Sequence, residues 1–298
     1  MATEDAFKDE EEYSKIFEVF SRGRLEHERI WVANKLVPKL VQKLSLKSNS
    51  SDFSVLAVGS GIGAFDIMLL EELMQGAKDF LGQRKIRWVV VDPNVSSVKR
   101  FKDDIENRTE KFDKVEFEWI DKSFEEYSSE NLASDVKFDF IHFVHILYYV
   151  DEDKVLQSAY EQFLNKPGLM LCVVGSKGDI WVNLIDSFSA KIESLGKELH
   201  YPTNVELCQI AKGHTWDCDV FDGKLDLEVS QIFIPGHPGG KALLQFFLHT
   251  RNDPKEMVGE KLYAELTEFF KSQSWEVVSD GSRKFFVNDN EGILLIYK

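Results

Sequence analysis

The chain has 298 residues, 43% of them hydrophobic, which is enough to bury one substantial core or two smaller ones. Its 51 acidic and 36 basic residues give a formal net charge of −15, which repels nucleic-acid phosphates. The same charge suits a cationic small molecule, but it is also typical of a protein that is acidic for solubility alone. An acidic start, scattered cysteines and no apolar run near about 18 residues argue against a secretory signal, a disulfide framework and a membrane span. We therefore expect a cytoplasmic protein with neither a nucleic-acid nor a membrane partner.

The segment before the first strand is predicted to be helical. Apolar residues recur at helical spacing between Asp9 and Leu44, and "SRGR" divides the pattern into two helices. The polar stretch "LKSNSSD" then indicates a linker.

Short apolar runs alternate with helical patterns up to residue 175. The runs predict strands at Ser54–Val58, Arg87–Val91, Val115–Trp119, Phe138–Phe143 and Met170–Val174. The patterns between them predict helices at Phe65–Leu81, Ser96–Arg108 and Asp153–Leu164. This alternation is typical of a parallel α/β sheet with helices on both faces, which binds ligands at the carboxyl ends of its strands.

The pattern is looser after Gly175. Helices are expected at Asp179–Leu195, Lys241–Thr250 and about Glu260–Ser272, with "IPGHPGG" as a loop. The segment "VNDNEG" is predicted to turn between two closing strands, Arg283–Val287 and Gly292–Tyr297. We expect these strands to be antiparallel additions to the sheet.

A glycine-rich turn follows the first predicted strand. The glycines of "GSGIGAFD", Gly59, Gly61 and Gly63, bring bare backbone to the start of a helix, a pattern typical of a ligand site but also of a simple tight turn. The same letters fit a dinucleotide fingerprint over Gly59–Ala64. Asp92 ends the next strand, where its carboxylate could bind both hydroxyls of a ribose. It lies 92 − 61 = 31 residues after Gly61, against roughly 20 in a dinucleotide site, so the spacing disfavours NAD and suits S-adenosylmethionine.

The segment "FDFIHFVHILYYVDEDK", followed by "LNKPGLMLCVV", resembles the later part of a class I S-adenosylmethionine-dependent methyltransferase. At closer range the chain resembles the histamine N-methyltransferase family nearly end to end. The likeness rests on "FEVFSRGRLEHE", "VGSGIGAFD", "VVVDPN", "FDFIHFVHILYYV", "GDIWVNL" and "FFVNDNEGILLIYK".

The resemblance implies a Rossmann-like seven-stranded α/β sheet with helices on both faces and a smaller substrate-binding insertion. It further implies a single methyltransferase domain over 1–298, N-terminal helices in 1–50 that cover the substrate site, and substrate-binding insertions within 176–272. We expect a monomer.

The resemblance also assigns roles to individual residues. The cofactor-binding positions are Gly59, Ser60, Gly61, Gly63, Asp92, Ser97, Ser123 and Val144. Glu26 is expected to pair with the ammonium group of the substrate. An aromatic substrate pocket is expected from Phe17, Phe20, Tyr148, Tyr149, Trp181 and Phe247.

Two positions depart from the family and become the candidate catalytic residues. His145 replaces a glutamine that binds the imidazole of histamine, and an asparagine near the C-terminus is replaced by Asp289, or is matched by Asn288 or Asn290 if the alignment shifts by one residue. Either His145 or Asp289 could orient an imidazole N–H and accept its proton. His142 and His145 are three apart on a predicted strand and point to opposite faces, so we expect no metal site.

These observations predict an S-adenosylmethionine-dependent N-methyltransferase acting on histamine or a similar small amine. The alternatives are a methyltransferase for another biogenic amine, an S-adenosylmethionine-binding protein whose changed acceptor site has lost chemistry, and an NAD-dependent oxidoreductase.

Overall fold

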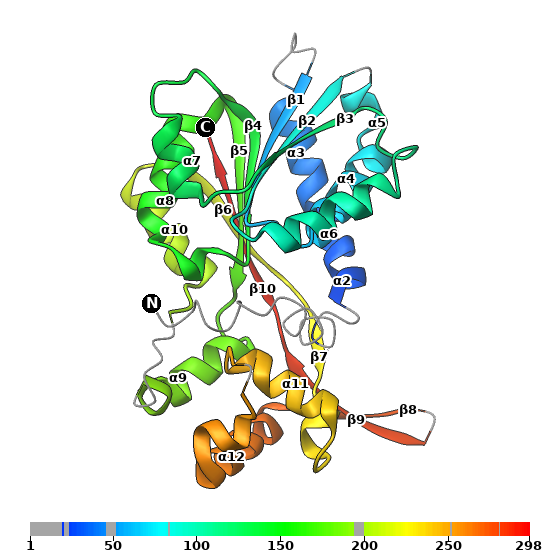
Figure 1. Cartoon of the computed structure of the whole chain (residues 1–298), viewed down its shortest axis with the longest axis vertical. Helices are drawn as coiled ribbons and strands as arrows, with labels where there is room; N and C mark the ends of the chain where they lie inside the picture. Colours follow the sequence, from blue (N-terminus) through cyan, green and yellow to red (C-terminus); the bar gives the residue numbers. More distant parts are fainter. Residues whose placement is uncertain are drawn as a thin grey trace. The chain divides into compact units, whose positions relative to one another are not determined.

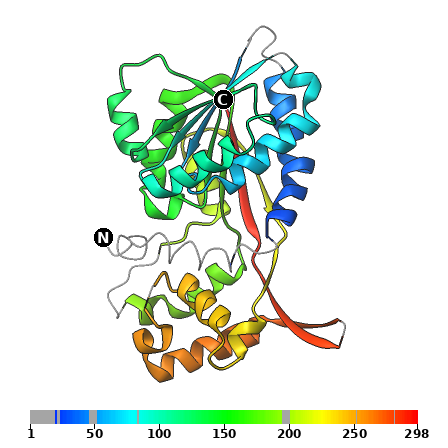
Figure 2. The ribbon, with the colours of Figure 1, turned by 45° about the vertical axis from the view of Figure 1, so that its right-hand side comes forward.

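The computed structural model describes residues 20, 24–45, 52–82, 84–193, 200–250, 252–279 and 281–298, and their side chains except those of 24–27, 192–193 and 279. Contacts divide the chain into two compact units (Figures 1 and 2). The sheet unit comprises Glu28–Val174, Asn204–Phe221 and Gly292–Lys298. The second unit comprises Met1–His27, Gly175–Thr203 and Asp222–Glu291. The prediction of a single domain over 1–298 stays a prediction.

A seven-stranded sheet with the order β3-β2-β1-β4-β5-β10-β6 is the centre of the sheet unit (Figure 1). Its strands are β1 Asp52–Val58, β2 Lys85–Val91, β3 Val115–Ile120, β4 Phe138–Val144, β5 Leu164–Gly175, β6 Asp217–Gly223 and β10 Glu291–Tyr297. The strands β1 to β5 pair in parallel with their neighbours. β10 runs antiparallel to β5, because Gly168 and Lys298 exchange both backbone hydrogen bonds.

Helices cover both faces of this sheet, as the sequence predicts. One face carries the helical segment that continues from Glu28 of α2 Arg24–Trp31 through η1 Val32–Leu36 and α3 Val37–Leu44, and then α4 Ala64–Gly76, α5 Lys78–Leu81 and α6 Val95–Glu106. The other carries α7 Phe124–Glu130, α8 Glu152–Ser158, η3 Ala159–Phe163 and α10 Asn204–Gly213 (Figure 1). The expected Rossmann-like fold is therefore confirmed.

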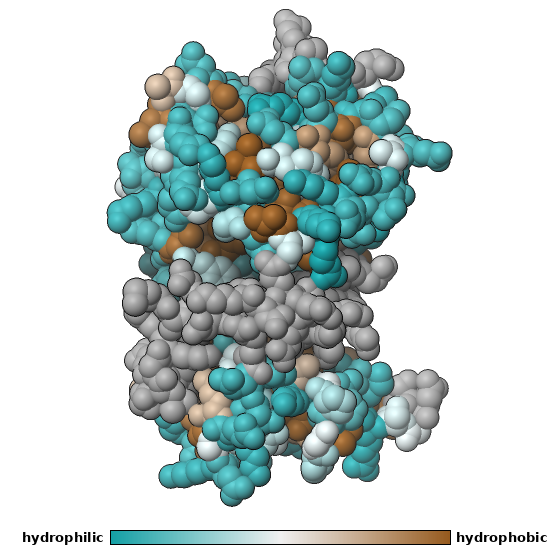
Figure 3. All heavy atoms as spheres, viewed as in Figure 1, coloured by the Kyte–Doolittle hydropathy of each residue, from teal (hydrophilic) through white to brown (hydrophobic). Residues whose placement is uncertain are grey.

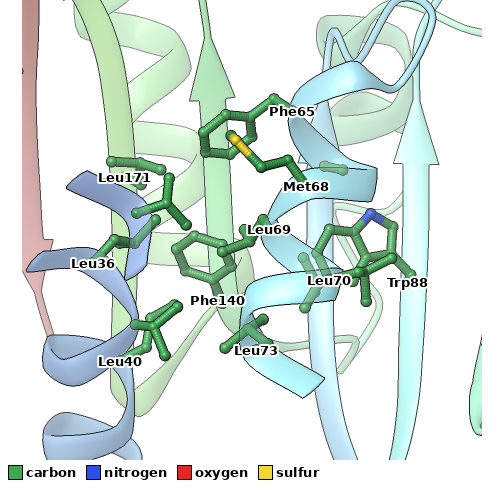
Figure 4. Packing of buried hydrophobic residues seen from close by; sticks show 14 of the residues in the cluster. Leu36, Leu40, Phe65, Met68, Leu69, Leu70, Leu73, Trp88, Phe140 and Leu171 are labelled. Atoms are coloured by element: carbon green, nitrogen blue, oxygen red, sulfur yellow. The ribbon is translucent and has the colours of Figure 1, made fainter. Parts of the chain in front are cut away.

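Alternate residues of β1 feed the two cores of the sheet unit. Val55 and Ala57 pack on the α4 side, whereas Leu56 and Val58 pack on the α7 and α8 side. Figure 4 shows the first core, where apolar side chains of α4 lie against Phe140 of β4 and Leu36 of η1. Because the central strands are buried on both faces, their ends are rigid supports for a site.

The second unit has its own small sheet and core. Its elements are the strands β7 Asp226–Glu228, β8 Trp275–Ser279 and β9 Ser282–Asn288, and the helices α9 Ile180–Glu193, η4 Ser230–Phe233, α11 Pro238–Phe247 and α12 Pro254–Gln273. β9 pairs antiparallel with β7 and β8, while β10 joins the large sheet. The prediction that both closing strands extend one sheet is therefore wrong for the first of them.

Local differences from the sequence prediction have identifiable causes. The helix expected at Phe65–Leu81 is interrupted at Ala77, whose φ of −122° and ψ of 30° leave the helical region. The predicted loop "IPGHPGG" is helical from Pro238, where proline at the first helical position suits the helix start. α7 was not predicted, although Ser123 and Glu126 form a capping box at its N-terminus.

The face of the molecule seen in Figure 3 is mostly hydrophilic, with apolar side chains in small patches. Within the described ranges, no helix combines the length and the apolar composition needed to cross a bilayer.

Candidate functional site

The carboxyl ends of three parallel strands meet at one edge of the large sheet. In the pairing register, Val58 of β1 lies opposite Val91 of β2 and Phe143 of β4. The residues that follow these three are Gly59, Asp92 and Val144, so the sheet itself brings three of the predicted cofactor-binding positions together.

The glycine bend, residues 59–63, is built on backbone conformations that favour glycine. Gly59, Gly61 and Gly63 have φ values of 69°, 55° and 73°. A Cβ at Gly59 would overlap Ile146, and one at Gly63 would overlap the ring of Phe101. At Gly61 no described atom lies within 4 Å of the position that a Cβ would take. The protein therefore excludes a side chain at the two ends of the bend, whereas none of the described residues blocks one at its middle.

Asp92 is bound directly to this bend. Its Oδ2 accepts a hydrogen bond from the N–H of Gly61 at 2.7 Å, and its Oδ1 accepts one from the N–H of Asn94 at 2.8 Å. Burial raises the pKa of the Asp92 carboxyl, the two N–H donors oppose that shift, and the charges of Asp66 and Asp121 add to it. Each oxygen keeps a second lone pair that could accept a ligand hydroxyl.

Asp66, which was not singled out from the sequence, supports the bend from within the protein. Its Oδ1 accepts hydrogen bonds from Trp88 Nε1 at 2.9 Å and from Ser60 Oγ at 3.3 Å, and it lies 3.2 Å from His142 Nε2. Asp66 and His142 are each 1% exposed. Ser60 is thus the link between the bend and a buried polar cluster of α4, β2 and β4.

Ser97 and Ser123 lie at helix starts in the sheet unit. The N–H of Ser97 donates to Asn94 Oδ1 at 2.8 Å, which caps α6 immediately after Asp92. Ser123 caps α7 after β3 and is half-buried. Their predicted contacts with the ribose and adenine parts of the cofactor stay predictions.

His145 follows β4 with a φ of 56°, a left-handed conformation that is uncommon for a residue with a side chain. Its N–H donates to Val173 O at 2.9 Å, which anchors it to β5. A carboxylate oxygen of Glu28, on α2, lies within 4.8 Å of a ring nitrogen of His145. Glu28 is only 8% exposed. The rings of Tyr148 and Tyr149 follow in the turn η2 Leu147–Tyr149, 4.7 Å apart.

Three of the predicted aromatic pocket residues lie together in the second unit. Trp181 of α9 contacts Phe247 of α11 at 4.6 Å and Phe20 at 6.0 Å between ring centroids. All three rings are buried, and Phe246 and Tyr201 pack against the same indole. These rings pack against one another, so their role as the wall of a substrate pocket stays a prediction.

Asp289 is buried in the second unit, and its N–H donates to Leu225 O at 3.0 Å. Of the alternative alignments, Asn288 is exposed, and Asn290 Oδ1 accepts the N–H of Leu225. A second buried acid, Asp179, accepts N–H groups of Ser176 and Val182 at the start of α9. Burial, with the charge of Asp289 adding to it, raises the pKa of Asp179 to about 7.

Two predicted substrate residues cannot be placed in this way. Phe17 lies outside the described residues, and for Glu26 only the backbone is described, within α2. The predicted pairing of Glu26 with an ammonium group therefore stays a prediction.

Asp66, Glu28 and Asp179 are among the buried acids that the sequence analysis does not single out. Each had a weak signal: Asp66 is an acid within an apolar helix, Glu28 follows the "EH" pair of the family motif, and Asp179 follows the fifth strand at "GSKGD".

The bend fits S-adenosylmethionine better than a dinucleotide. The N–H groups of Gly59, Gly61 and Gly63 all donate within the protein, to Val91 O, Asp92 Oδ2 and Ser60 O, so none of the three is left to bind a pyrophosphate. The charges that act on Asp92 are both acidic, which favours a cationic sulfonium over an anionic pyrophosphate. The chemistry of these donors and charges therefore supports the cofactor that the spacing of Asp92 predicts.

Comparisons with known proteins find curated relatives and solved structures that are similar to this chain. Mouse (Mus musculus) histamine N-methyltransferase is 22% identical over 97% of this chain and 96% of its own length. Chicken (Gallus gallus) carnosine N-methyltransferase 2 is 25% identical over 81% of this chain and 74% of its own. No protein-family model matches the chain. Among solved structures, the plantazolicin methyltransferase BpumL in complex with SAH aligns over 99% of this chain and 93% of its own with 13% identity and a TM-score of 0.49. The curated relatives confirm the resemblance of this chain to the histamine N-methyltransferase family of S-adenosylmethionine-dependent N-methyltransferases.

Proposed function

We propose that this chain transfers a methyl group from S-adenosylmethionine to an imidazole nitrogen of histamine or of a similar small amine. The observation that carries the proposal is the carboxylate of Asp92 held against the glycine bend among other acids. Histamine and carnosine both contain an imidazole ring, so the two kinds of relative support an imidazole acceptor.

The cofactor would be held by Gly59, Ser60, Gly61, Gly63, Asp92, Ser97, Ser123 and Val144. When bound, it supplies a methyl group on a positively charged sulfur. The chain must then present the acceptor nitrogen with its lone pair free and keep water away, since most of the acceleration of such a reaction comes from positioning.

Other residues would bind the amine substrate and accept its proton. A ring nitrogen of His145 would take the proton that the acceptor loses, with Glu28 orienting the imidazole and Asp289 as the second candidate. Glu26 would pair with the ammonium group of the amine. The aromatic residues Phe17, Phe20, Tyr148, Tyr149, Trp181 and Phe247 would enclose its ring.

Calorimetry and methyl transfer test the proposal on the full chain. S-adenosylhomocysteine should bind and NAD should not, and Asp92→Asn should weaken that binding by at least tenfold, about 1.4 kcal/mol. Radiolabelled S-adenosylmethionine should then label histamine within a panel of imidazole and aryl amines. Binding without labelling of any amine would favour a cofactor-binding protein, and binding of NAD alone would favour an oxidoreductase.

The His145→Gln variant tests which amine accepts the methyl group, because it restores the glutamine of the histamine N-methyltransferase family. Lower KM for histamine in this variant, with unchanged affinity for S-adenosylhomocysteine, would show that His145 selects a different amine. Loss of turnover in the variant would instead support His145 as the proton acceptor.

The proposal includes the expected cytoplasmic location and monomeric state. Light scattering of the purified chain, with the mass of 34.3 kDa as the expected value, tests the second point.

A further inference from the structure

Two of the three cysteines lie side by side in the sheet unit. Cys208 of α10 and Cys218 of β6 place their sulfur atoms 3.2 Å apart, and both are free thiols. A disulfide bond is about 2 Å long, so the two sulfurs need to approach by only about 1.2 Å to bond. Cys172, the third cysteine, is fully buried on β5.

The chain segment between the two cysteines includes the turn that joins α10 to β6, and this turn is held in place by hydrogen bonds and ring stacking. The N–H groups of His214, Thr215 and Trp216 donate to carbonyls of the last turn of α10, at 3.1, 3.0 and 2.9 Å. The indole of Trp216 stacks on Tyr160 at 4.2 Å. The turn therefore fixes β6 against α10, and the thiols face each other because of the fold.

We propose that Cys208 and Cys218 form a dithiol site that a low-molecular-weight disulfide, such as oxidised glutathione, converts to an intramolecular disulfide. Cys218 is half-buried and Cys208 more deeply buried, so the Cys218 thiolate attacks first. It bonds to one glutathione sulfur and releases the other as a thiol. The Cys208 thiolate then attacks the Cys218 sulfur and releases the second glutathione. The protein loses two electrons and two protons, and one glutathione disulfide becomes two thiols.

The surroundings of the pair set its reactivity. Burial raises the pKa of the Cys218 thiol to about 11, the neighbouring Cys208 and Asp219 add to this shift, and Lys212 opposes it. The phenol of Tyr297 on β10 also lies close to Cys218. Because only the thiolate reacts, exchange is slow near neutral pH and accelerates as the pH rises.

The experiment treats the reduced full chain with oxidised glutathione at pH 7.5 and at about pH 9, both below the raised pKa of Cys218, so that the thiolate fraction is larger at the higher pH. The number of titratable thiols, measured after denaturation, should fall from three to one, with faster loss at the higher pH. Intact mass should show the loss of two hydrogen atoms, and peptide mapping should join the peptides of Cys208 and Cys218. The closed ring spans 218 − 208 + 1 = 11 residues, which should raise Tm by about 5 °C.

Matched variants separate this pair from other thiol chemistry. Cys172→Ala should still form the disulfide, whereas Cys218→Ser should keep both remaining thiols and show no rise in Tm. A glutathione adduct that persists on Cys218, a disulfide between two chains, a bond to Cys172 or retention of all three thiols would each overturn the proposal. None of these results depends on methyl transfer.

Discussion

Replacing Gly61 by alanine tests two properties of the glycine bend separately, namely its effect on stability and its contact with the proposed cofactor. The residue has a φ of 55°, and no described atom lies within 4 Å of the position of the added methyl group. The left-handed conformation costs an L-residue about 1–2 kcal/mol, so Gly61→Ala should lower the free energy of unfolding by that amount. In the proposed site, the added methyl group would lie where the backbone meets the cofactor. We therefore expect the Kd for S-adenosylhomocysteine to rise at least tenfold, about 1.4 kcal/mol.

Urea unfolding and calorimetry measure the two effects separately. Gly281→Ala is the matched control, because Gly281 has a φ of 74°, equally open surroundings and a place in the β8–β9 turn. It should lose the same 1–2 kcal/mol of stability, by the same strain, and keep its affinity. Gly63→Ala adds overlap with Phe101 to the strain, so about 2–5 kcal/mol of stability should be lost. If Gly61→Ala binds the ligand as well as the wild type does, the middle of the bend does not contact the cofactor and the reasoning is refuted.

Three other predictions concern the buried acids. Asp66→Asn should reduce the free energy of unfolding by about 1–3 kcal/mol, because Trp88 loses a charged acceptor, and should weaken S-adenosylhomocysteine binding through Ser60; equal stability in urea would contradict this. Glu28→Gln should reduce turnover at least tenfold and leave the cofactor affinity measured by calorimetry unchanged. Unchanged turnover would show that the carboxylate does not act on His145. The Asp179 carboxyl should stay protonated in the folded state up to about pH 7, whereas its unfolded pKa is near 3.8, so its contribution to stability should fall as pH rises from about 4 to 7. Three pKa units set an upper bound of about 4 kcal/mol, and Asp179→Asn should flatten that slope in urea unfolding measured between these pH values.

The parallel part of the sheet could be predicted because its signal is local. Strands such as β1 and β2 are buried on both faces, so they appear in the sequence as continuous apolar runs between helices. α7 gave no such signal, since only Phe124, Tyr127 and Ser128 of its seven residues are buried. Its start was encoded by the capping pair Ser123 and Glu126 rather than by periodicity.

The error about the closing strands has a different cause. Apolar alternation predicts that Arg283–Val287 and Gly292–Tyr297 are strands, and both are. It does not predict partners, because those depend on residues far away in the sequence. Leu227 pairs with Val287, and Gly168 pairs with Lys298, so two adjacent strands end in different sheets.

The same distinction explains which acids of the candidate site could be predicted. Asp92 stands immediately after an apolar strand, and the carboxyl ends of parallel strands share one edge of the sheet. The position of Asp92 near the glycine bend therefore follows from the topology alone. Asp66 lies inside a helix whose apolar residues leave no clear polar face, and a sequence pattern cannot distinguish a buried acid there from a solvated one. The burial of Asp66 follows from the sheet register. The pairing of β1 with β2 and β4 brings Trp88 and His142 onto the sheet face that α4 covers. A carboxylate that is 1% exposed needs a donor such as the indole N–H of Trp88, because burying it without one would cost several kcal/mol. The cluster was therefore determined by the sheet register, and the hydroxyl of Ser60 is the point at which it reaches the bend.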